Sequence, residues 1–343
     1  MFDKKIKSKI FYLFVILLIS IVLAMGLVSN AQEKKSVLRV GAWPGAYTEV
    51  MQATIGTFEE DNNCTIEWVP DSAGDMLVKS RAHVVDIVFG DPIFAYIGEA
   101  QDLWEKLDEK SIPNLNNLYD FAKLSDYTIV TDYGVYGLAY NPKFITDPPT
   151  SWLAIWNPKY KTSIRGSAAD SIELLVLMAE LNGGDDHNID PGFKKMSELT
   201  DIVVTWWKEY SEILTLWKSE DVWVTMITNG RAKWLGSEGA NIEWVIPKEG
   251  GFPMISTINV VKGGENVELA KKFVNWRLSN PPQERFAEQL YYAPSVRGVN
   301  LDPETTKLMP SNEEISNLKT VDWRYIMNVF DEWTERWDKE IYH

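Results

Sequence analysis

The stretch EWVIPKEGGFPMISTINVVKGG, residues 243–264, decides how this chain folds, because it contains two apolar, strand-like runs in close succession. The first run ends at Val245, and the second covers 255–261. Between them, the Lys-Glu-Gly-Gly turn at 248–251 leaves too little room for a helix. The fold therefore depends on whether the two runs belong to one sheet or to two separate bodies.

The sequence before this stretch begins with an alternation of strand and helix patterns. Strand-like runs at 37–41, 65–69 and 84–89 each lead through a loop rich in Gly, Pro or Asp into a helical pattern. This repeated order predicts a mainly parallel sheet with helices on its faces. In such α/β sheets, ligands collect at the loops that leave the carboxyl ends of the strands.

A proline-rich stretch at 147–161 separates this series from a second one that ends at Val245 and includes an expected helix over 193–210. If the second series forms its own body, the strand-like run 136–140 leaves the first body and the run 255–261 returns to it. Two crossings predict an α/β fold of two lobes, each a mainly parallel sheet flanked by helices, joined by a hinge. The predicted boundaries are 36–135 with 256–302 for the first lobe, 136–255 for the second lobe, and 303–343 for helices at the C-terminus.

Small residues mark the expected crossings. We expect Gly134, Gly137 and the segment 250–255 to lie at or near the hinge, since glycine absorbs backbone rotation without steric cost. Gly134 also separates the strand-like run 136–140 from an earlier one at 127–130. The pattern therefore predicts two strands here.

The N-terminal segment 1–31 has the composition of an export signal. Lysines from Lys4 to Lys9 precede the apolar run 10–28, and Ser29-Asn30-Ala31 supplies small residues for cleavage. The run is also long enough to span a bilayer, which takes ~20 residues. The sequence therefore predicts an extracytoplasmic protein, periplasmic or at the cell surface, whose segment 1–31 is either removed or retained as a membrane anchor.

Composition and motifs exclude several classes of function. The formal net charge of −15 at pH 7 argues against nucleic acid as a partner, because binding phosphates needs a basic surface. The sequence holds no GxSxG elbow, no HExxH zinc motif and no phosphate-binding glycine loop. Cys64 is the only cysteine, so no internal disulfide can form. We therefore expect a protein that is not an enzyme and that needs no cofactor.

One acidic turn, GGDDHNID at 183–190, has side chains that could hold a metal ion. Its candidate ligands are Asp185, Asp186, His187 and Asp190. Their spacing fits no standard calcium loop. A solvated turn is the better interpretation, so we expect no metal site.

Six motifs occur in an order and spacing typical of one family: LRVGAWPGAY, VVDIVFGDP, PTSWLAIWNPKYKTSI, VTMITNGRAKW, IEWVIPKEGGFPM and FAEQLYYAPS. Over most of 36–300, the chain resembles the bilobal solute-binding proteins of ABC importers, and among them the spermidine/putrescine-binding type. The resemblance implies a type II periplasmic-binding-protein fold that holds its ligand between the lobes. It also implies a monomeric receptor that presents its solute to membrane permease and ATPase subunits.

The resemblance places three aromatic residues around the ligand: Trp43, Tyr47 and Tyr292. An aromatic face attracts an ammonium group. The chain departs from the polyamine-binding pattern at its acidic positions, because 254–257 holds no carboxylate and Asp170 is shifted in register. A diamine would lose a counter-charge, which is costly in a buried site. We therefore expect a small amine-bearing or zwitterionic solute.

The predicted ligand-binding residues come from loops at the expected cleft. They are Trp43, Tyr47, Ser72, Asp91, Asp170, Thr228, Asn229, Arg231, Ser256 and Tyr292. Ser72, Ser167 and Thr228 precede helices, so they could help bind an anion or simply cap those helices. Arg231 could pair with an anionic ligand or with Glu238.

Two alternative functions stay open at this point. Tyr291-Tyr292 is similar to the paired tyrosines of ferric-ion-binding relatives, although here the pair follows the return crossing. The first alternative is therefore a ferric-ion- or anion-binding relative. The second is a receptor domain that senses a ligand without transporting it.

The C-terminal region contains one strong helical pattern. Trp323 to Trp337 forms an amphipathic stripe that includes Ile326, Phe330 and Trp333. The resemblance suggests that this helix packs back on the second lobe.

Overall fold

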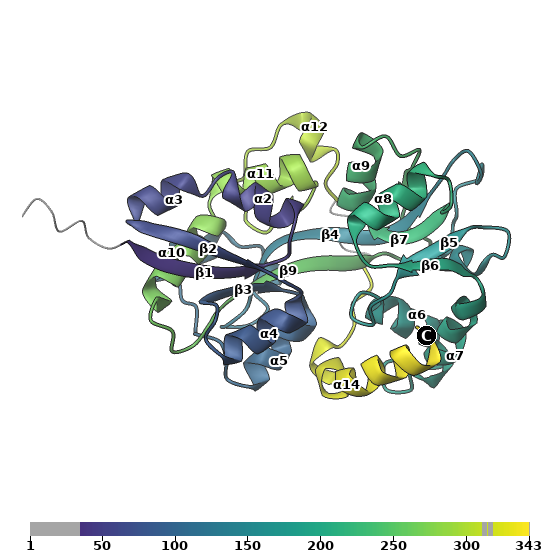
Figure 1. The fold of residues 1–343 in the computed structure, drawn as a ribbon, viewed down its shortest axis with the longest axis horizontal. Helices are drawn as coiled ribbons and strands as arrows, with labels where there is room; N and C mark the ends of the chain where they lie inside the picture. The colour runs from purple at the N-terminus through teal and green to yellow at the C-terminus, as the bar shows by residue number, and fades with distance from the viewer. Residues whose placement is uncertain (1–34, 311–313, 315–317, 343) are drawn as a thin grey trace, which may run out of the picture.

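The computed structural model describes residues 35–310, 314 and 318–342 (Figure 1). The predicted export segment, 1–31, lies outside these residues. Among the helices of the described residues, none combines the length and the apolar character needed to cross a membrane.

Within the described ranges, ten strands form one hydrogen-bonded sheet in the order β2-β1-β3-β9-β4-β7-β5-β6, with β8 and β10 both paired to β4. The strands are β1 (Ser36–Ala42), β2 (Cys64–Pro70), β3 (Ile87–Gly90), β4 (Ile129–Tyr140), β5 (Thr162–Arg165), β6 (Val203–Trp207), β7 (Val224–Thr228), β8 (Glu243–Val245), β9 (Phe252–Val260) and β10 (Ala293–Pro294).

The sheet has two parallel ends and an antiparallel middle. β1 pairs in parallel with β2 and β3, and β5 pairs in parallel with β6 and β7. β4 and β9 lie between these ends and are antiparallel to each other and to their outer neighbours β7 and β3. Figure 1 shows β4 and β9 passing between the two halves of the molecule. The fold consists of two α/β lobes connected by two long strands, as predicted.

Helices cover both faces of each half of the sheet (Figure 1). In Figure 1, α2, α3 and α11 lie above the first lobe's strands and α4 and α5 below them, whereas α8 and α9 lie above those of the second lobe and α6 and α7 below. The helices are α2 (Ala46–Gln52), α3 (Gly56–Asp61), α4 (Ala73–Arg81), α5 (Pro92–Ala100), α6 (Ile172–Leu181), α7 (Asp190–Ser197), α8 (Tyr210–Lys218), α9 (Asn229–Ser237), α10 (Val267–Arg277), α11 (Asn280–Leu290), α12 (Pro303–Thr306) and α14 (Trp323–Glu340).

Each lobe has its own large hydrophobic core. The core of the first lobe includes Leu38, Phe89 and Phe273, and that of the second includes Trp152 and Leu174. β9 begins in the second core, with its first residue, and ends in the first core, with its last. The stretch that opened the sequence analysis therefore contains a strand shared by two bodies.

The strand β4 is longer than its sequence pattern predicts. Two strands were expected, at 127–130 and 136–140, but β4 is a single strand of 12 residues, so this prediction is wrong. Gly134 pairs with Met254 of β9, and the ladder continues through it. The register shifts instead between Val130 and Asp132, as it does at a β-bulge. An interior glycine can mark close backbone packing as well as a strand end.

Two glycines near the crossings occupy positions that suit no larger residue. A Cβ atom at Gly137 would lie 2.6 Å from the carbonyl oxygen of Val245 in β8. Gly250, in the turn before β9, has a φ of 100°, which L-residues rarely adopt. Glycine is therefore required here by close packing and by a turn, and its role in a hinge stays a prediction.

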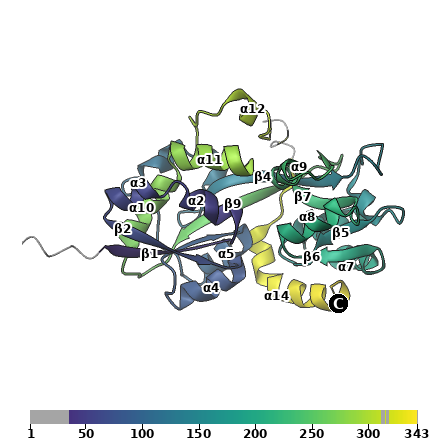
Figure 2. The ribbon, with the colours of Figure 1, turned by 45° about the horizontal axis from the view of Figure 1, so that its top comes forward.

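The C-terminal helix α14 contacts both lobes. Its residues Ile326, Phe330, Trp333 and Trp337 are buried in the second lobe's core. Phe330 also packs edge-on against Phe94 of α5, with 5.6 Å between ring centroids. In Figures 1 and 2, α12 lies near α11, on the opposite side of the molecule from α14. The C-terminal helices are thus divided between two sides of the fold.

Candidate functional site

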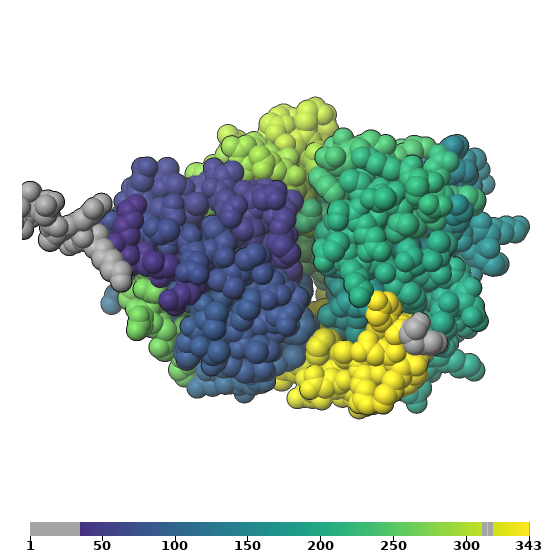
Figure 3. All heavy atoms as spheres, viewed as in Figure 1, coloured from purple at the N-terminus to yellow at the C-terminus, as the bar shows by residue number. Residues whose placement is uncertain are grey.

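A cleft of about 330 Å³ lies between the two lobes, next to β4 and β9. Figure 3 shows the groove along which the lobes face each other. Its first-lobe wall is formed by Trp43, Pro44, Tyr47, Asp71, Ser72, Ala73, Gly74, Asp91 and Phe94. The opposite wall and floor are formed by Tyr136, Arg165, Ser167, Ala169, Asp170, Glu209, Tyr210, Arg231, Met254, Ser256 and Tyr292. Ligand pockets commonly measure roughly 300–1,000 Å³, so this cleft suits a small solute.

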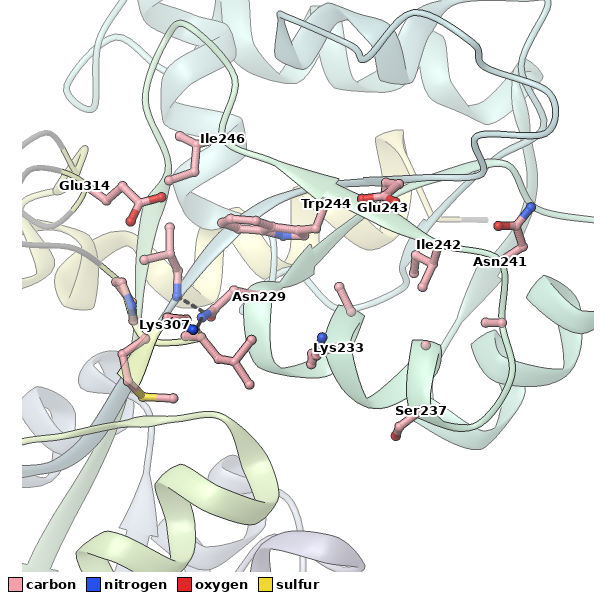
Figure 4. Close-up of a pocket in the computed structure, with 17 residues that line it drawn as sticks. Asn229, Lys233, Ser237, Asn241, Ile242, Glu243, Trp244, Ile246, Lys307 and Glu314 are labelled. Carbon is pink, nitrogen blue, oxygen red and sulfur yellow. Dashed lines mark hydrogen bonds between the residues drawn. The ribbon is translucent and has the colours of Figure 1, made fainter. Parts of the chain in front are cut away.

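A larger cavity, about 710 Å³, lies elsewhere on the second lobe and shares no lining residue with the cleft (Figure 4). Its walls come mainly from α9, the segment 240–246 and the residues 307–310. Lys233 and Glu243 in these walls are exposed to solvent. The cleft is the better candidate site, because its two walls belong to different lobes and hold charged groups that are buried, as Arg231 is, or half-buried, as Asp91 is.

The loop that leaves β1 supplies an aromatic wall. Trp43 packs edge-on against Tyr47, with 4.9 Å between ring centroids, and keeps part of its surface open to the cleft. Tyr47 is buried and packs in the same way against Phe286, again at 4.9 Å. This buried cluster holds the Trp43 ring at the cleft surface.

A buried ion pair lies behind Tyr47. Arg277 donates to Asp132 Oδ2 over 2.6 Å, and both side chains are almost completely buried. The hydroxyl groups of Tyr47 and Thr131 donate to the same oxygen, each over 2.9 Å. Burial, followed by the charge of Asp132, raises the pKa of the Tyr47 phenol, so it stays protonated and donates. The pair thereby connects β4 and α10 to the aromatic wall.

Asp91 presents an unsatisfied carboxylate to the cleft. It follows the last residue of β3 and precedes α5, but its side chain makes no capping hydrogen bond. Desolvation, followed by the charge of Asp170, raises the pKa of this carboxyl to about 7, while Arg165 opposes the rise. The carboxylate forms no ion pair with any described residue. A cation bound beside it would remove the cost of holding its charge there.

Asp170 differs from Asp91 because it already has a partner. Arg165, the last residue of β5, donates to Asp170 Oδ1 over 2.8 Å. The Arg165 guanidinium also lies over the rings of Trp207 and Tyr210, 5.4 Å from each centroid. The Asp170 charge is therefore largely neutralised by the protein itself.

Arg231 is a buried cation held between aromatic rings. Its guanidinium lies 4.3 Å from the ring centroid of Tyr210 and 5.8 Å from that of Tyr292. The residue is only 8% exposed. Within the described chain, its Nε atom has no hydrogen-bond partner and no carboxylate forms an ion pair with it. The predicted alternative, a pair with Glu238, does not form.

Tyr292 reaches the cleft because helix α11 ends abruptly. Its C-cap residue, Tyr291, adopts the left-handed conformation with φ of 57°. The chain therefore turns, and Tyr292 packs into the first lobe's core while still lining the cleft. Burial raises the pKa of Tyr292 to about 12, so its hydroxyl is protonated at neutral pH.

Of the predicted site residues, all but Thr228 and Asn229 line the cleft. Thr228 is fully buried and caps α9, accepting a hydrogen bond from Arg231 N over 3.3 Å. Asn229 lines the larger cavity instead, where its Oδ1 accepts from Val135 N over 3.0 Å (Figure 4). Ser72 also caps its helix, accepting from Asp75 N over 3.2 Å.

The cleft residues that were not predicted include the polar side chains of Tyr136, Arg165, Glu209 and Tyr210. Arg165 ends a strand, so the rule that selected Asp91 could have found it. Glu209 and Tyr210 follow β6. They were missed because a helix was expected over 193–210, whereas 203–207 forms this strand. Its Val-Val-Thr-Trp-Trp sequence, rich in β-branched and aromatic residues, is the signal that favours a strand.

The stability of the ligand-free protein is expected to decrease as the pH rises from about 5 to about 8, and the titration of Glu173 is one cause. Glu173 is buried in the first turn of α6, and desolvation, together with the charges of Asp91 and Asp170, raises its pKa to about 8. Since the carboxyl pKa in an unfolded chain is about 4.3, folding takes up a proton in this range. This contribution is complete below the unfolded pKa and is lost as pH rises through the folded one.

Urea unfolding at several pH values tests this expectation. The Glu173→Gln variant should show a shallower loss of stability with rising pH. Glu180→Gln, on the same helix but exposed, is the matched control and should follow the parent protein. Identical pH slopes in Glu173→Gln and the parent would contradict the prediction.

Comparison with a family model and with known proteins finds proteins that bind solutes. A family model described as bacterial extracellular solute-binding protein matches residues 82–329. The chain is 26% identical over 267 residues to the spermidine/putrescine-binding periplasmic protein of Escherichia coli (strain K12), covering 72% of each protein. It is 24% identical over 214 residues to the gamma-aminobutyric acid-binding protein of Pseudomonas aeruginosa, covering 59% of this chain and 60% of that protein.

The fold also matches a solved structure. The crystal structure of an ABC transporter from Clostridium perfringens ATCC 13124 superposes with a TM-score of 0.73 and 24% sequence identity. The match covers 89% of this chain and 99% of the other. This likeness shows the two-lobed, type II periplasmic-binding-protein architecture.

Proposed function

Because this chain belongs to the bacterial extracellular solute-binding proteins, we propose that it captures a small amine-bearing or zwitterionic solute in the cleft between its lobes. The protein is a solute-binding receptor of an ABC importer and not an enzyme. Its relatives are periplasmic proteins. We place this receptor outside the cytoplasm, as a monomer that delivers its solute to permease and ATPase subunits.

The observation that carries the ligand class is the combination of an aromatic wall with a carboxylate that has no protein partner. Trp43 offers a ring face, and Asp91 offers a carboxylate on the same lobe. An ammonium group gains from both, through attraction to the ring quadrupole and through direct ion pairing. The cleft volume, about 330 Å³, supports a small solute.

Closure supplies the second part of the proposal. The predicted lobe boundaries, at 135/136 and 255/256, fall inside β4 and β9, which we propose as the hinge. A solute that touches both walls makes all its contacts only when the lobes have closed. The difference in contact free energy between open and closed states therefore drives closure.

Replacing Trp43 with alanine is expected to weaken solute binding. Loss of one cation–π contact costs about 0.5–2 kcal/mol, or roughly two- to thirtyfold in Kd. Isothermal titration calorimetry with the solute identified below measures this. Trp43→Phe keeps an aromatic face and should lose less, while Trp276→Ala, in the first lobe but outside the cleft, should leave Kd unchanged. Unchanged affinity in Trp43→Ala would contradict the site assignment.

The solute itself can be identified on the purified protein. Native mass spectrometry would report any molecule that copurifies, and a thermal-shift panel of polyamines, amino acids, betaines and phosphonates would extend the search. A ligand at about 100 times its Kd stabilises the folded state by about 2.7 kcal/mol. If no small solute binds in either assay, the proposed function is wrong.

A further inference from the structure

Two opposite charges face the cleft from different lobes without a partner of opposite charge among the described residues. Asp91 stands at the N-terminus of α5 in the first lobe, and Arg231 stands in the first turn of α9 in the second. In the described part of the chain, neither side chain forms an ion pair. An interlobe site with one unpaired charge on each wall is suited to a ligand that carries both opposite charges.

The other charged groups of the cleft are already matched or open to water. Asp170 accepts a hydrogen bond from Arg165 over 2.8 Å, and Asp71 accepts one from Lys79 over 2.5 Å. Glu209 is exposed at the rim, where water solvates it. These groups therefore need no ligand to balance their charges. A ligand has to balance the charges of Asp91 and Arg231, which have no ion-pair partner in the described chain.

The burial of Arg231 is the stronger of the two observations. The residue is more than nine-tenths buried, and its Nε atom lies without a hydrogen-bond partner among the described residues. The Tyr210 ring, 4.3 Å from the guanidinium, and hydrogen bonds to the Tyr210 and Tyr292 side chains offset only part of the cost of removing a cation from water, because these neutral groups bring no opposite charge. A planar anionic group, such as a carboxylate, would complete the environment through paired hydrogen bonds.

We propose that the solute is a zwitterion with one cationic amine and one anionic group, and that Arg231 and Asp91 select it by binding the anion and the amine, respectively. This inference rests on the proposed function, because it concerns the same cleft. A diamine would place its second ammonium group against Arg231, and a simple anion would leave Asp91 unpaired. Both alternatives keep one uncompensated charge when the lobes close.

Four-carbon probes with matched chains test the charge requirement directly. 4-Aminobutanoate carries both charges, 1,4-diaminobutane carries two positive charges, and butanoate carries only the negative charge. 2-Aminoethylphosphonate tests whether a phosphonate can replace the carboxylate. In calorimetric titrations we expect a zwitterion to bind at least ~30-fold more tightly than the diamine or the simple anion. A diamine that binds as tightly as every zwitterion would overturn the inference.

Variants at the two charges locate the selectivity. Arg231→Met should weaken zwitterion binding at least ~30-fold and should narrow or reverse the preference over the diamine. Asp91→Asn should weaken the zwitterion while leaving binding of butanoate unchanged or stronger. Lys233→Met, an exposed cation on the same helix as Arg231, is the matched control and should change neither affinity nor preference.

The stability of ligand-free Arg231→Met separates a binding role from a structural one. If the role of Arg231 is to bind the anionic group of a ligand, removing its uncompensated buried charge should leave the melting temperature of the ligand-free protein unchanged or raise it. A clear fall in melting temperature, with the charge preference of the probes unchanged, would show a structural role and overturn the inference. The ratio of the affinity for the zwitterion to the affinity for the diamine distinguishes the binding role from the structural role, because a general packing defect would weaken the binding of both probes alike.

The outcomes also separate this inference from the proposed function. If none of the probes binds but native mass spectrometry finds a copurifying solute, the charges of that solute decide: a zwitterion supports the inference, and a diamine or an uncharged solute overturns it. In the second case the receptor function still stands. If no solute binds by any assay, the proposed function fails, and the inference fails with it.

Discussion

The Asp132→Ala variant is expected to lose about 3–5 kcal/mol of stability, because it leaves the charge of Arg277 buried without a partner. The Arg277 side chain is completely buried, and in the described chain its Nε and Nη1 atoms have no hydrogen-bond partner. Among the residues that the structure describes, Asp132 is the one carboxylate that forms an ion pair with it. The variant also removes the acceptor of the Tyr47 hydroxyl, which positions the aromatic wall of the cleft.

Urea unfolding monitored by fluorescence measures this loss. Asp126→Ala is a suitable control, since Asp126 forms exposed ion pairs with Lys106 and Lys123, and such pairs contribute little. The double variant Asp132→Leu with Arg277→Met removes both charges and should recover much of the loss. A single Asp132→Ala variant as stable as the Asp126→Ala control would contradict the assignment of a buried ion pair.

The second large effect is expected at Trp152. Trp152→Ala should cost about 3–5 kcal/mol, because it removes a fully buried aromatic side chain from the second lobe's core. The ring stacks on Phe252, the first residue of β9, with 5.1 Å between centroids. Its Nε1 donates to the carbonyl oxygen of Gly250 over 2.8 Å. Trp152 therefore anchors the start of the returning strand to the second lobe.

Two further variants separate the parts of this effect. Trp152→Phe keeps the stacking but loses the hydrogen bond, and it should cost only about 1 kcal/mol beyond the change in packing. Leu153→Ala, at the next position but 46% exposed, should stay within about 0.5 kcal/mol of the parent protein. If Trp152→Ala and Leu153→Ala proved equally stable, Trp152 would not be the anchor that the structure indicates.

The sequence was sufficient for the two-lobed architecture. The alternation of strands and helices is a local pattern, and the turn at 248–251 allows only a direct strand-to-strand connection. The same reasoning located several loops that meet at the cleft, since the carboxyl ends of parallel strands share one edge of a sheet. Trp43 and Asp91 line the cleft for this reason.

The sequence was not sufficient for side-chain direction within an element. Asn229 and Arg231 are two positions apart on α9, and both were predicted to face the ligand. Two positions on an α-helix differ by about 200° of rotation. Arg231 consequently faces the cleft, while Asn229 faces the larger cavity on the other side. The orientation of α9 against its lobe, which no local pattern encodes, decided which of them points inward.

By itself, the sequence determined that the chain forms two α/β bodies linked by direct crossings, because periodicity and turn chemistry act over a few neighbouring residues. Only the tertiary structure decided which charges are paired. Arg277 meets Asp132 across 145 positions of sequence, and Arg165 neutralises Asp170, whereas Arg231 contacts Tyr210 and Tyr292 and has no carboxylate partner in the described part of the chain. An ion pair depends on the distance between two side chains in space, and packing of separate elements sets that distance.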